Sequence, residues 1–416
     1  MTRPVPIGDY RKKVFGLSQN VVYLGVVSFL TDVSSEMIFT LLPLFLSNVL
    51  GATTLIIGFI EGVAETTASL LKFFSGWLSD KLGKRRELAV IGYGLSALTK
   101  PFMYIASTWG LVLGIRFTDR LGKGIRSAPR DALIADSASV QERGKAFGFH
   151  RAMDTSGAAI GLTCSAVIVL ILQQNSVVLV NDTYKLLVVI GVIPAILALF
   201  VFFFIRDVVK APQMRSDSEI RTIEYGRDKN AKADVTSLNT RFKVFLVIMF
   251  IFTLGNSSDA FLILRAQNTG NSVLHILLML IMFNIVYALV SIPAGIISDK
   301  VGRRRIIILG WFIYVLTYLG FALVSASWQV WLLFAVYGAY YGLAEGVARA
   351  FVADLVPEER RGTAFGLFHS TVGLTLLPAS LIAGWLWQTI SPASAFYFGA
   401  AMALVAMIGL LVLVRE

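Results

Sequence analysis

The sequence of 416 residues is poor in cysteine, histidine and charge, and each shortage excludes a class of protein. A single cysteine, Cys164, excludes an intrachain disulfide and a cysteine-based metal cluster. Only 15% of the residues are charged and 56% are hydrophobic, whereas soluble domains carry about 25% charged residues. A soluble chain of this composition would aggregate, so the sequence predicts an integral membrane protein.

Motifs for cofactors and catalysis are also missing. Gly122-Lys123-Gly124 lacks the spaced glycine and the following Ser or Thr of a nucleotide-binding P-loop. The sequence contains neither an H-E-x-x-H motif nor a Cys/His metal-binding set. We therefore expect no cofactor, no metal and no enzymatic activity. Any energy requirement is expected to be met by an ion gradient.

Long apolar runs dominate what is present. A helix needs about 20 mostly apolar residues to cross a bilayer, and twelve runs are of about that length. In the first half they are Val21–Leu46, Leu55–Leu78, Leu88–Ile105, Trp109–Leu133, Ala146–Leu172 and Leu186–Ile205. In the second half they are Phe242–Leu264, Val273–Ile297, Ile306–Val324, Trp328–Val352, Ala364–Trp387 and Ser394–Val414. The sequence thus predicts an all-α protein with twelve transmembrane helices.

The net charge of +11 is spread over the segments between the apolar runs, without a basic domain, which argues against a nucleic-acid partner. Lys and Arg collect in cytoplasmic loops, so we expect a protein of the cytoplasmic (inner) membrane with both termini inside the cell. The predicted organisation is a cytoplasmic N-terminus (1–20), a six-helix bundle (21–205), a cytoplasmic linker (206–241) and a second six-helix bundle (242–416).

One eleven-residue motif occurs twice. The first copy is Gly76-Trp-Leu-Ser-Asp80-Lys-Leu-Gly83-Lys84-Arg85-Arg86; the second, 219 residues later, is Gly295-Ile-Ile-Ser-Asp299-Lys-Val-Gly302-Arg303-Arg304-Arg305. The glycines suit a close backbone approach and a turn with positive φ. A second pattern repeats too, because Asp136 followed by Glu142-Arg143-Gly144 matches Asp354 followed by Glu359-Arg360-Arg361-Gly362. The halves are therefore internal repeats.

The repeated motif resembles the signature loop of the major facilitator superfamily. The resemblance covers nearly the whole chain. It implies two six-helix bundles related by a pseudo-two-fold axis, alternating access to a central cavity, and a monomer. It also implies that Asp80 and Asp299 hold the inward-closed state by contacting helix N-termini of the opposite half. The gating residues expected from it are Gly76, Asp80, Gly83, Arg85, Asp136, Arg143, Gly295, Asp299, Gly302, Arg304, Asp354 and Arg361, with Asp136–Arg143 and Asp354–Arg361 as pairs.

Ionisable residues inside the predicted spans are the candidate cavity residues. Each costs about 2.5–3.5 kcal/mol or more at the bilayer centre, so it must face a water-filled cavity or another charge. The predicted proton-coupling and cavity residues are Asp32, Glu36, Glu61, Glu65, Arg116, Asp119, Arg120, Arg151, Asp154, Asp259, Glu345 and Arg349. The same residues would equally suit salt bridges that break and re-form between states.

The two halves differ in the charge of their spans. In the first half six acids (Asp32, Glu36, Glu61, Glu65, Asp119 and Asp154) balance six bases (Lys72, Lys100, Arg116, Arg120, Lys123 and Arg151), which argues against a phosphate or carboxylate substrate. The second half has fewer charges and a cluster of Tyr337, Tyr340 and Tyr341. We expect a cavity with one polar and one apolar or aromatic wall, unless these tyrosines only pack in the core.

The fourth span carries a partial second resemblance. Arg116-Phe-Thr-Asp119-Arg120 lies where the drug:proton antiporter branch carries R-x-x-Q-G. In the fifth span Gly157 and Gly161 match the antiporter motif of that branch, but Leu162 replaces its proline, which leaves the direction of transport open. The resemblance implies an arginine beside a proton-binding acid. We expect Asp32 or Glu36 to be the proton site, paired with Arg116 or Arg120.

These patterns predict a secondary active transporter that moves a small organic solute by alternating access and is coupled to protons. Efflux of an amphipathic compound, such as a drug or a siderophore-like metabolite, is the leading hypothesis. Proton-coupled import of a small polar nutrient or siderophore is the first alternative, and lipid flipping is the second. The partners expected are the lipid bilayer, a small-molecule substrate and the proton.

Overall fold

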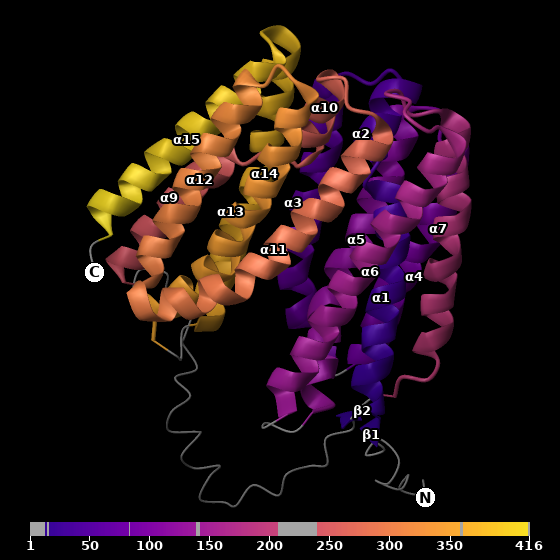
Figure 1. The fold of residues 1–416 in the computed structure, drawn as a ribbon. Coiled ribbons are helices and arrows are strands. Elements are labelled where there is room, and N and C mark those ends of the chain that lie inside the picture. Colours follow the sequence, from indigo (N-terminus) through magenta and orange to yellow (C-terminus); the bar gives the residue numbers. More distant parts are fainter. Residues whose placement is uncertain are drawn as a thin grey trace, which may run out of the picture.

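The computed structural model describes residues 13–14, 16–82, 84–138, 142–206, 239–357 and 361–414. Almost all of them are helical, and the long helices run alongside one another in two groups (Figure 1). We call residues 16–206 the first half and residues 239–414 the second half. A short antiparallel pair of strands, β1 (Lys13–Val14) and β2 (Leu17–Ser18), precedes the first helix.

The first half contains six spans, two of which end in a separate helical turn. They are α1 (Gln19–Phe39) with α2 (Leu42–Leu44) and the π-helical η1 (Phe45–Val49), α3 (Thr54–Leu82), α4 (Arg85–Thr99) with the 3-10 helix η2 (Lys100–Ile105), α5 (Trp109–Asp136), α6 (Arg143–Leu172) and α7 (Asn181–Phe202). Pro43 and Pro101 lie where α2 and η2 begin, because proline cannot supply the backbone hydrogen bond of a continuing helix.

The second half repeats this plan. Its helices are α9 (Thr240–Gly255), α10 (Ala260–Asn268), α11 (Val273–Val301), α12 (Arg303–Leu323), α13 (Ser327–Asp354), α14 (Arg361–Thr389) and α15 (Pro392–Leu413). The predicted span Phe242–Leu264 is therefore not continuous. The chain leaves the helix between α9 and α10 at the polar sequence Asn256-Ser-Ser-Asp259, whose side chains compete for backbone hydrogen bonds.

In the described chain, eleven segments, each a single helix or a run of consecutive helices, are long and apolar enough to cross a membrane. The twelfth predicted span is α5, whose 28 residues extend over about 42 Å. It carries too many charges to read as a span by composition, but it packs between α3 and α4 inside the first half. The prediction of an all-α membrane fold is confirmed.

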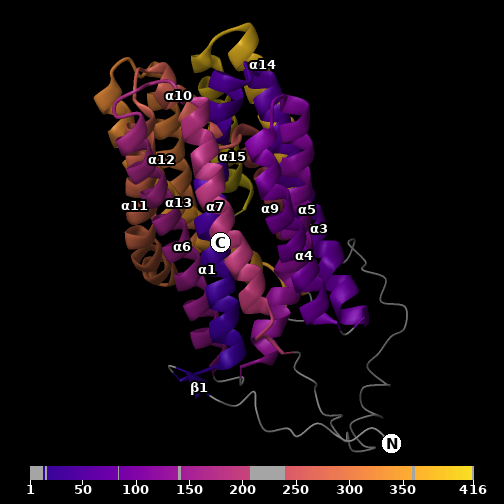
Figure 2. The ribbon, with the colours of Figure 1, turned by 90° about the vertical axis from the view of Figure 1, so that its right-hand side faces the viewer.

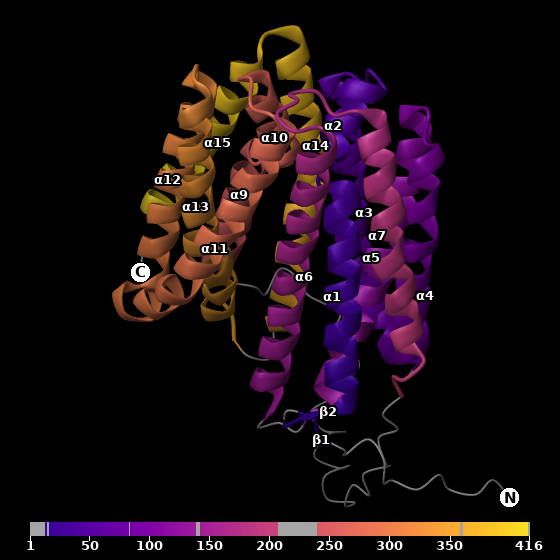
Figure 3. The same cartoon turned by 45° about the vertical axis from the view of Figure 1, so that its right-hand side comes forward.

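Each half forms its own bundle, and the bundles meet along two pairs of helices. In the first half α1 packs on α6 and α7, and α5 on α3 and α4; in the second half α13 packs on α11 and α12, and α15 on α9 and α12. Figure 2 shows α7 crossing in front of α1. Between the halves, α3 lies against α14 and α6 against α11; the second contact is visible in Figure 3.

Most of the hydrogen bonds that join the halves of the described chain lie toward one end of the molecule. We call the end where α7 stops and α9 begins the linker side, and the opposite end the far side. On the far side Asn48 and Gln267 exchange hydrogen bonds of 2.6 and 3.1 Å, and Thr54 Oγ1 donates to Gly384 O at 3.2 Å. Near the middle, Thr66 Oγ1 donates to Gly373 O at 2.8 Å. This structure therefore holds the halves together at the far side.

Candidate functional site

A cavity of about 170 Å³ lies in the first half between the helices α1 and α5. Its lining residues are Asp32, Ser35, Glu36, Phe39, Thr40, Arg116, Asp119, Arg120, Lys123 and Arg126. They recur every three or four residues on each helix, so each set forms one helix face. The two polar faces point at each other, and only Phe39 contributes no polar group.

Ion pairs hold the α5 wall of this cavity against α3. Arg116 Nη2 lies 3.1 Å from Glu61 Oε2, and both side chains are almost fully buried. One turn further along α5, Arg120 Nη1 lies 3.0 Å from Glu65 Oε1. Asp119 lies 3.8 Å from Arg116 and 3.7 Å from Arg120, and it accepts a hydrogen bond from Ser96 of α4. Two of the three arginines that line the cavity, Arg116 and Arg120, are therefore already neutralised by α3.

The proton-site pairing expected from the sequence differs from this arrangement, because Arg116 and Arg120 pair with Glu61 and Glu65 rather than with Asp32 or Glu36. Glu36 accepts a hydrogen bond of 2.5 Å from Thr40 Oγ1. Asp32 lines the same cavity, yet it makes none of the hydrogen bonds or ion pairs found among the described residues. It is the carboxylate of the cavity that is not committed to a partner.

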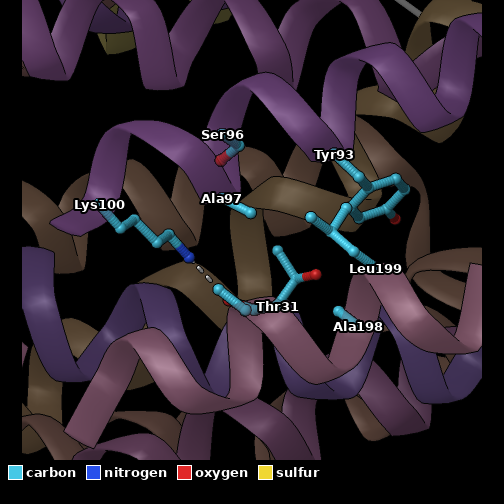
Figure 4. A pocket seen from close by; sticks show the side chains of 8 residues that line it. Thr31, Tyr93, Ser96, Ala97, Lys100, Ala198 and Leu199 are labelled. Atoms are coloured by element: carbon cyan, nitrogen blue, oxygen red, sulfur yellow. Dashed lines mark hydrogen bonds between the residues drawn. The ribbon is translucent and has the colours of Figure 1, made fainter. Parts of the chain in front are cut away.

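Lys100 lies behind the α1 wall of the cavity and is completely buried. Its ammonium donates to Ser34 Oγ at 2.8 Å and Ser35 Oγ at 3.0 Å, and it lies 3.5 Å from Thr31 O. Figure 4 shows it reaching from the start of η2, directly after α4, to α1 beside a small pocket that Tyr93, Ser96 and Leu199 also line. Lys100 thus connects the junction of α4 and η2 to the turn of α1 that carries Asp32.

Comparison with known proteins decides the family. The family model for the Major Facilitator Superfamily matches residues 24–263 and again residues 244–416. The chain belongs to the Major Facilitator Superfamily. An uncharacterized MFS-type transporter of Methanocaldococcus jannaschii is 39% identical over 403 residues, which cover 95% of each chain. An uncharacterized protein of Mycobacterium tuberculosis is 27% identical over 376 residues, covering 88% of this chain and 86% of its own.

Solved transporters share this superfamily fold at low sequence identity. The nucleoside transporter NupG has a TM-score of 0.73 at 13% identity, covering 96% of this chain and 100% of its own. A D-xylose-proton symporter has a TM-score of 0.72 at 17% identity, covering 95% and 97%. These likenesses show the fold, and with the family model they make the chain an MFS-type secondary transporter.

The signature loops of the superfamily lie on the linker side, and each is tied to its own half in this state. Arg85 pairs with Asp136. Arg303 lies 3.1 Å from Asp354 and 3.4 Å from Asp299, so Asp136 and Asp354 are paired with residues of the repeated motif. The predicted partners Arg143 and Arg361, together with Asp80, have side chains outside the described part of the chain, and Gly83 lies outside it entirely.

The backbone of the second signature loop is described completely. Gly302 has a φ of +101°, which a residue with a side chain rarely adopts, as the turn requires. Gly295 has open space where a Cβ would stand, and at Gly76 a Cβ would meet only Ala128 at 3.4 Å. Arg304 donates to the carbonyls of Leu410 and Leu411 at the end of α15. The close backbone approach of a neighbouring helix that we expected at Gly76 and Gly295 is therefore not seen in this structure.

Four of the five remaining predicted cavity residues form two groups around tyrosines. Arg151 of the first half donates to Tyr287 Oη at 3.4 Å, and Tyr287 donates to Glu345 at 2.7 Å, with Arg349 paired to the same carboxylate. This group joins α6 to α11 and α13 across the halves. In the first half Asp154 lies 3.6 Å from the buried His150.

Asp259 lies at the break between α9 and α10 and accepts a hydrogen bond of 2.7 Å from Tyr337. Tyr337 and Tyr340 are buried, and their rings pack against Tyr314 and Tyr318, whereas Tyr341 is only half buried. Two of the three predicted tyrosines therefore belong mainly to the core of the second half.

The cavity residues predicted from the sequence do not include Arg126, although it lines the cavity. The signal was present in the spacing. Residues 116, 119, 120, 123 and 126 lie on one face of a helix, so the polar face of α5 that begins at Arg116 includes Arg126. Its guanidinium stacks on the ring of Tyr93 with 4.5 Å between Cζ and the ring centroid.

Proposed function

We propose that this transporter couples the movement of a small organic solute to protons, with Asp32 as the proton-binding residue. The observation that supports this proposal is a carboxylate that lines a charged cavity and has no ion-pair or hydrogen-bond partner among the described residues. A carboxylate held by an arginine is fixed in its ionised form, whereas an uncommitted one can take up and release a proton as the cavity changes its access to water.

The energetics suit such coupling. One proton that crosses about 100 mV releases about 2.3 kcal/mol, which supports a solute gradient of roughly 50-fold. The paired arginines would keep the wall of the cavity intact while Asp32 changes charge. Lys100 donates hydrogen bonds to Ser34 and Ser35, which lie in the same turn of α1 as Asp32. A change in the charge of Asp32 would therefore also change the electrostatic energy of this contact between α1 and Lys100.

The orientation proposed is the one in which the linker side faces the cytoplasm. The basic loops around Lys84 and Arg303 lie on that side, as cytoplasmic loops of inner-membrane proteins do. On this orientation the halves are joined at the periplasmic side, and the structure corresponds to an inward-facing state of a monomer. Asp299 would then find its partner in the opposite half only after the linker side has closed.

Two directions of transport have support. Export of an amphipathic compound is supported by a cavity whose charged wall belongs to the first half while aromatic side chains gather in the second. Multidrug resistance protein MdtH of Photorhabdus laumondii is 30% identical over 125 residues, which is 30% of this chain. Uptake of a small polar solute is supported by the lining itself, in which nine of ten residues carry a polar group.

Proteoliposomes with a trapped pH-sensitive dye test coupling and direction together. A panel of drugs, organic acids, amino acids and lysolipids is added outside. A compound that enters in exchange for protons makes the lumen more alkaline, and one that enters with protons makes it more acidic. Lysolipid movement without a pH change would point to lipid flipping instead.

The matched variants are Asp32→Asn and Asp182→Asn. Asp32→Asn is expected to remove the solute-driven proton flux, while Asp182→Asn, at an exposed carboxylate in the first turn of α7, should keep it. Glu36→Gln tests the other predicted proton site. Proton-driven transport that survives both Asp32→Asn and Glu36→Gln would rule out proton binding on this face of α1.

A further inference from the structure

Two cations of the cavity have no hydrogen-bond or ion-pair acceptor in the described part of the chain. Lys123 and Arg126 stand one turn apart on α5 and both line the cavity, and neither side chain takes part in a hydrogen bond or ion pair among the described residues. Arg126 is 6% exposed, and its Nη1 atom is completely buried without a partner. A buried charge is normally paired, because removing an ion from water is energetically costly. An unpaired buried guanidinium therefore marks a place where an anion is missing.

The other cations of this region are accounted for. Arg116 and Arg120 are neutralised by Glu61 and Glu65 of α3, and the ammonium of Lys100 is held by the hydroxyls of α1. The balance of six acids and six bases in the sequence thus hides an uneven distribution. The acids on α3 pair with the first two arginines of α5, and the next two cations of the same helix face, Lys123 and Arg126, have no ion-pair partner among the described residues.

The geometry of Arg126 suits a planar or tetrahedral anion. The ring of Tyr93 covers one face of its guanidinium, so the N–H groups that remain lie along the edge of the plane. That edge matches two oxygens of a carboxylate or phosphate, and the hydrogen bonds to a charged acceptor are about twice as strong as neutral ones. Lys123 adds a second, compact positive charge. Its ammonium can bind a third oxygen of the anion or one of the two oxygens that Arg126 binds.

The size of the cavity limits what can enter. Its volume of about 170 Å³ equals the share of about five or six waters in the liquid. That is room for an anionic head group with a few attached atoms. The rest of a larger solute would extend out of this cavity toward the second half.

We infer that Lys123 and Arg126 bind the anionic group, a carboxylate or a phosphate, of the transported solute. This inference rests on the proposed function and names the substrate class of the same cavity. Of the three carboxylates that line the cavity, Asp32 is the one without a hydrogen-bond or ion-pair partner among the described residues, and it competes with the anion for the two cations. A proton on Asp32 would remove this competition, so the anion and the proton would bind together.

Binding of simple probes to the detergent-solubilised full-length protein tests the inference by titration calorimetry. Benzoate, phenyl phosphate and the neutral isostere benzamide share one ring and differ in the head group. Benzoate, phenyl phosphate or both should bind, and benzamide should not. The tighter of the two anions identifies the head group as carboxylate or phosphate. Equal binding of benzamide, or no binding of either anion, overturns the inference.

The variants separate the site from nonspecific attraction. Arg126→Gln should weaken anion binding at least tenfold, and Arg126→Lys several-fold, because lysine keeps the charge but lacks the planar edge. Arg241→Gln removes an exposed arginine at the start of α9 and should change nothing. Wild-type affinity in both Arg126 variants contradicts the inference. Should Arg126→Gln fail to fold, Lys123→Gln carries the test, with a several-fold loss expected and unchanged affinity counting against the site.

Asp32→Asn gives an effect of the opposite sign. Removing the competing charge should tighten anion binding several-fold, and weaker binding would contradict the competition. These titrations need no proton gradient. Anion binding without solute-driven proton flux in proteoliposomes would leave the anion site standing and overturn the proposed coupling, whereas proton flux driven only by neutral or cationic solutes would overturn the anion site alone.

Discussion

The two halves of the molecule have the same helical plan and opposite interior chemistry. In the first half, buried ion pairs connect α3 to α5, and charged side chains line the cavity. In the second half, the corresponding interior contains a cluster of tyrosine rings in mutual contact, and Asp259 accepts a hydrogen bond from one of them. An internal repeat therefore preserves backbone packing and leaves side-chain chemistry free to diverge. The first half contains carboxylates that can gain or lose a proton. The tyrosine rings of the second half keep the same charge, so the surface that they form stays the same.

The same contrast predicts different responses to mutation. A buried ion pair is worth little net, but removing one partner leaves an uncompensated charge and is costly. An aromatic hydroxyl on the edge of a packed cluster can be removed with the loss of one hydrogen bond. Single substitutions of buried polar residues should therefore reduce stability more in the first half than in the second.

Glu61→Gln should have the largest effect. It leaves Arg116 buried without its carboxylate at 3.1 Å, and breaking such a pair costs about 3–5 kcal/mol. The melting temperature in detergent should fall strongly. Glu65→Gln is the matched variant: because Glu65 is 37% exposed at its side chain, water can compensate for part of the loss. Equal losses in the two variants would show that burial does not set the cost.

Gly384→Ala tests the surface where the halves meet at the far side. A Cβ at Gly384 would stand 2.6 Å from Thr54 O and 2.9 Å from the Cα of Leu55, both backbone atoms of α3. Such overpacking costs about 1–3 kcal/mol and should shift the carrier away from the state seen here. Cysteine accessibility at the far side, measured with an introduced cysteine in the Cys164→Ala background, should rise.

Gly295→Ala is the control at the linker side, where a Cβ would meet open space. It should leave accessibility of the far side unchanged in this state. A rise in both variants would mean that the far-side contact between α3 and α14 is not what holds the halves together.

Tyr337→Phe should have a moderate effect, confined to the second half. It removes the hydrogen bond of 2.7 Å to Asp259. Because Asp259 is exposed and water can replace the phenol, we expect the lower end of the range for a bond to a charged group, about 1.5 kcal/mol. Tyr340→Phe is the control, since its hydroxyl makes none of the hydrogen bonds of the described chain. A larger loss for Tyr340→Phe would mean that ring packing, not the bond to Asp259, stabilises this cluster.

The family, the helical fold and the number of spans could be predicted from the sequence because each rests on a local signal. Apolar length gives the spans, and the repeated loop around Gly76 and Gly295 identifies the superfamily. The break before Asp259 was missed, because the hydrophobic run continues on both sides of it. The extension of α3 to Leu82 was also missed, because a helix continues into polar sequence once its backbone hydrogen bonds are made.

Pairing within the site could not be predicted, because it depends on which helices are neighbours. Composition gave equal numbers of acids and bases in the first half, and from it we expected no preference for an anion. The structure places Glu61 and Glu65 beside Arg116 and Arg120, and among the described residues it gives Arg126 no carboxylate partner. A count of charges carries no information on these distances, so it could not distinguish a neutral cavity from one with an unmatched end.

Lys84→Gln should have the smallest effect and completes the comparison. Lys84 Nζ lies 3.0 Å from Glu87 Oε2, almost the same distance as in the Arg116–Glu61 pair. The side chain of Lys84 is 61% exposed, however, and that of Glu87 is 56% exposed. Exposed pairs of this kind contribute about 0.2–1 kcal/mol at most, so the melting temperature should stay within the error of the wild type. The two pairs share their chemistry and differ in burial. If Lys84→Gln lowers the melting temperature as much as Glu61→Gln does, the cost of breaking an ion pair in the first half is set by contact distance and not by burial away from water.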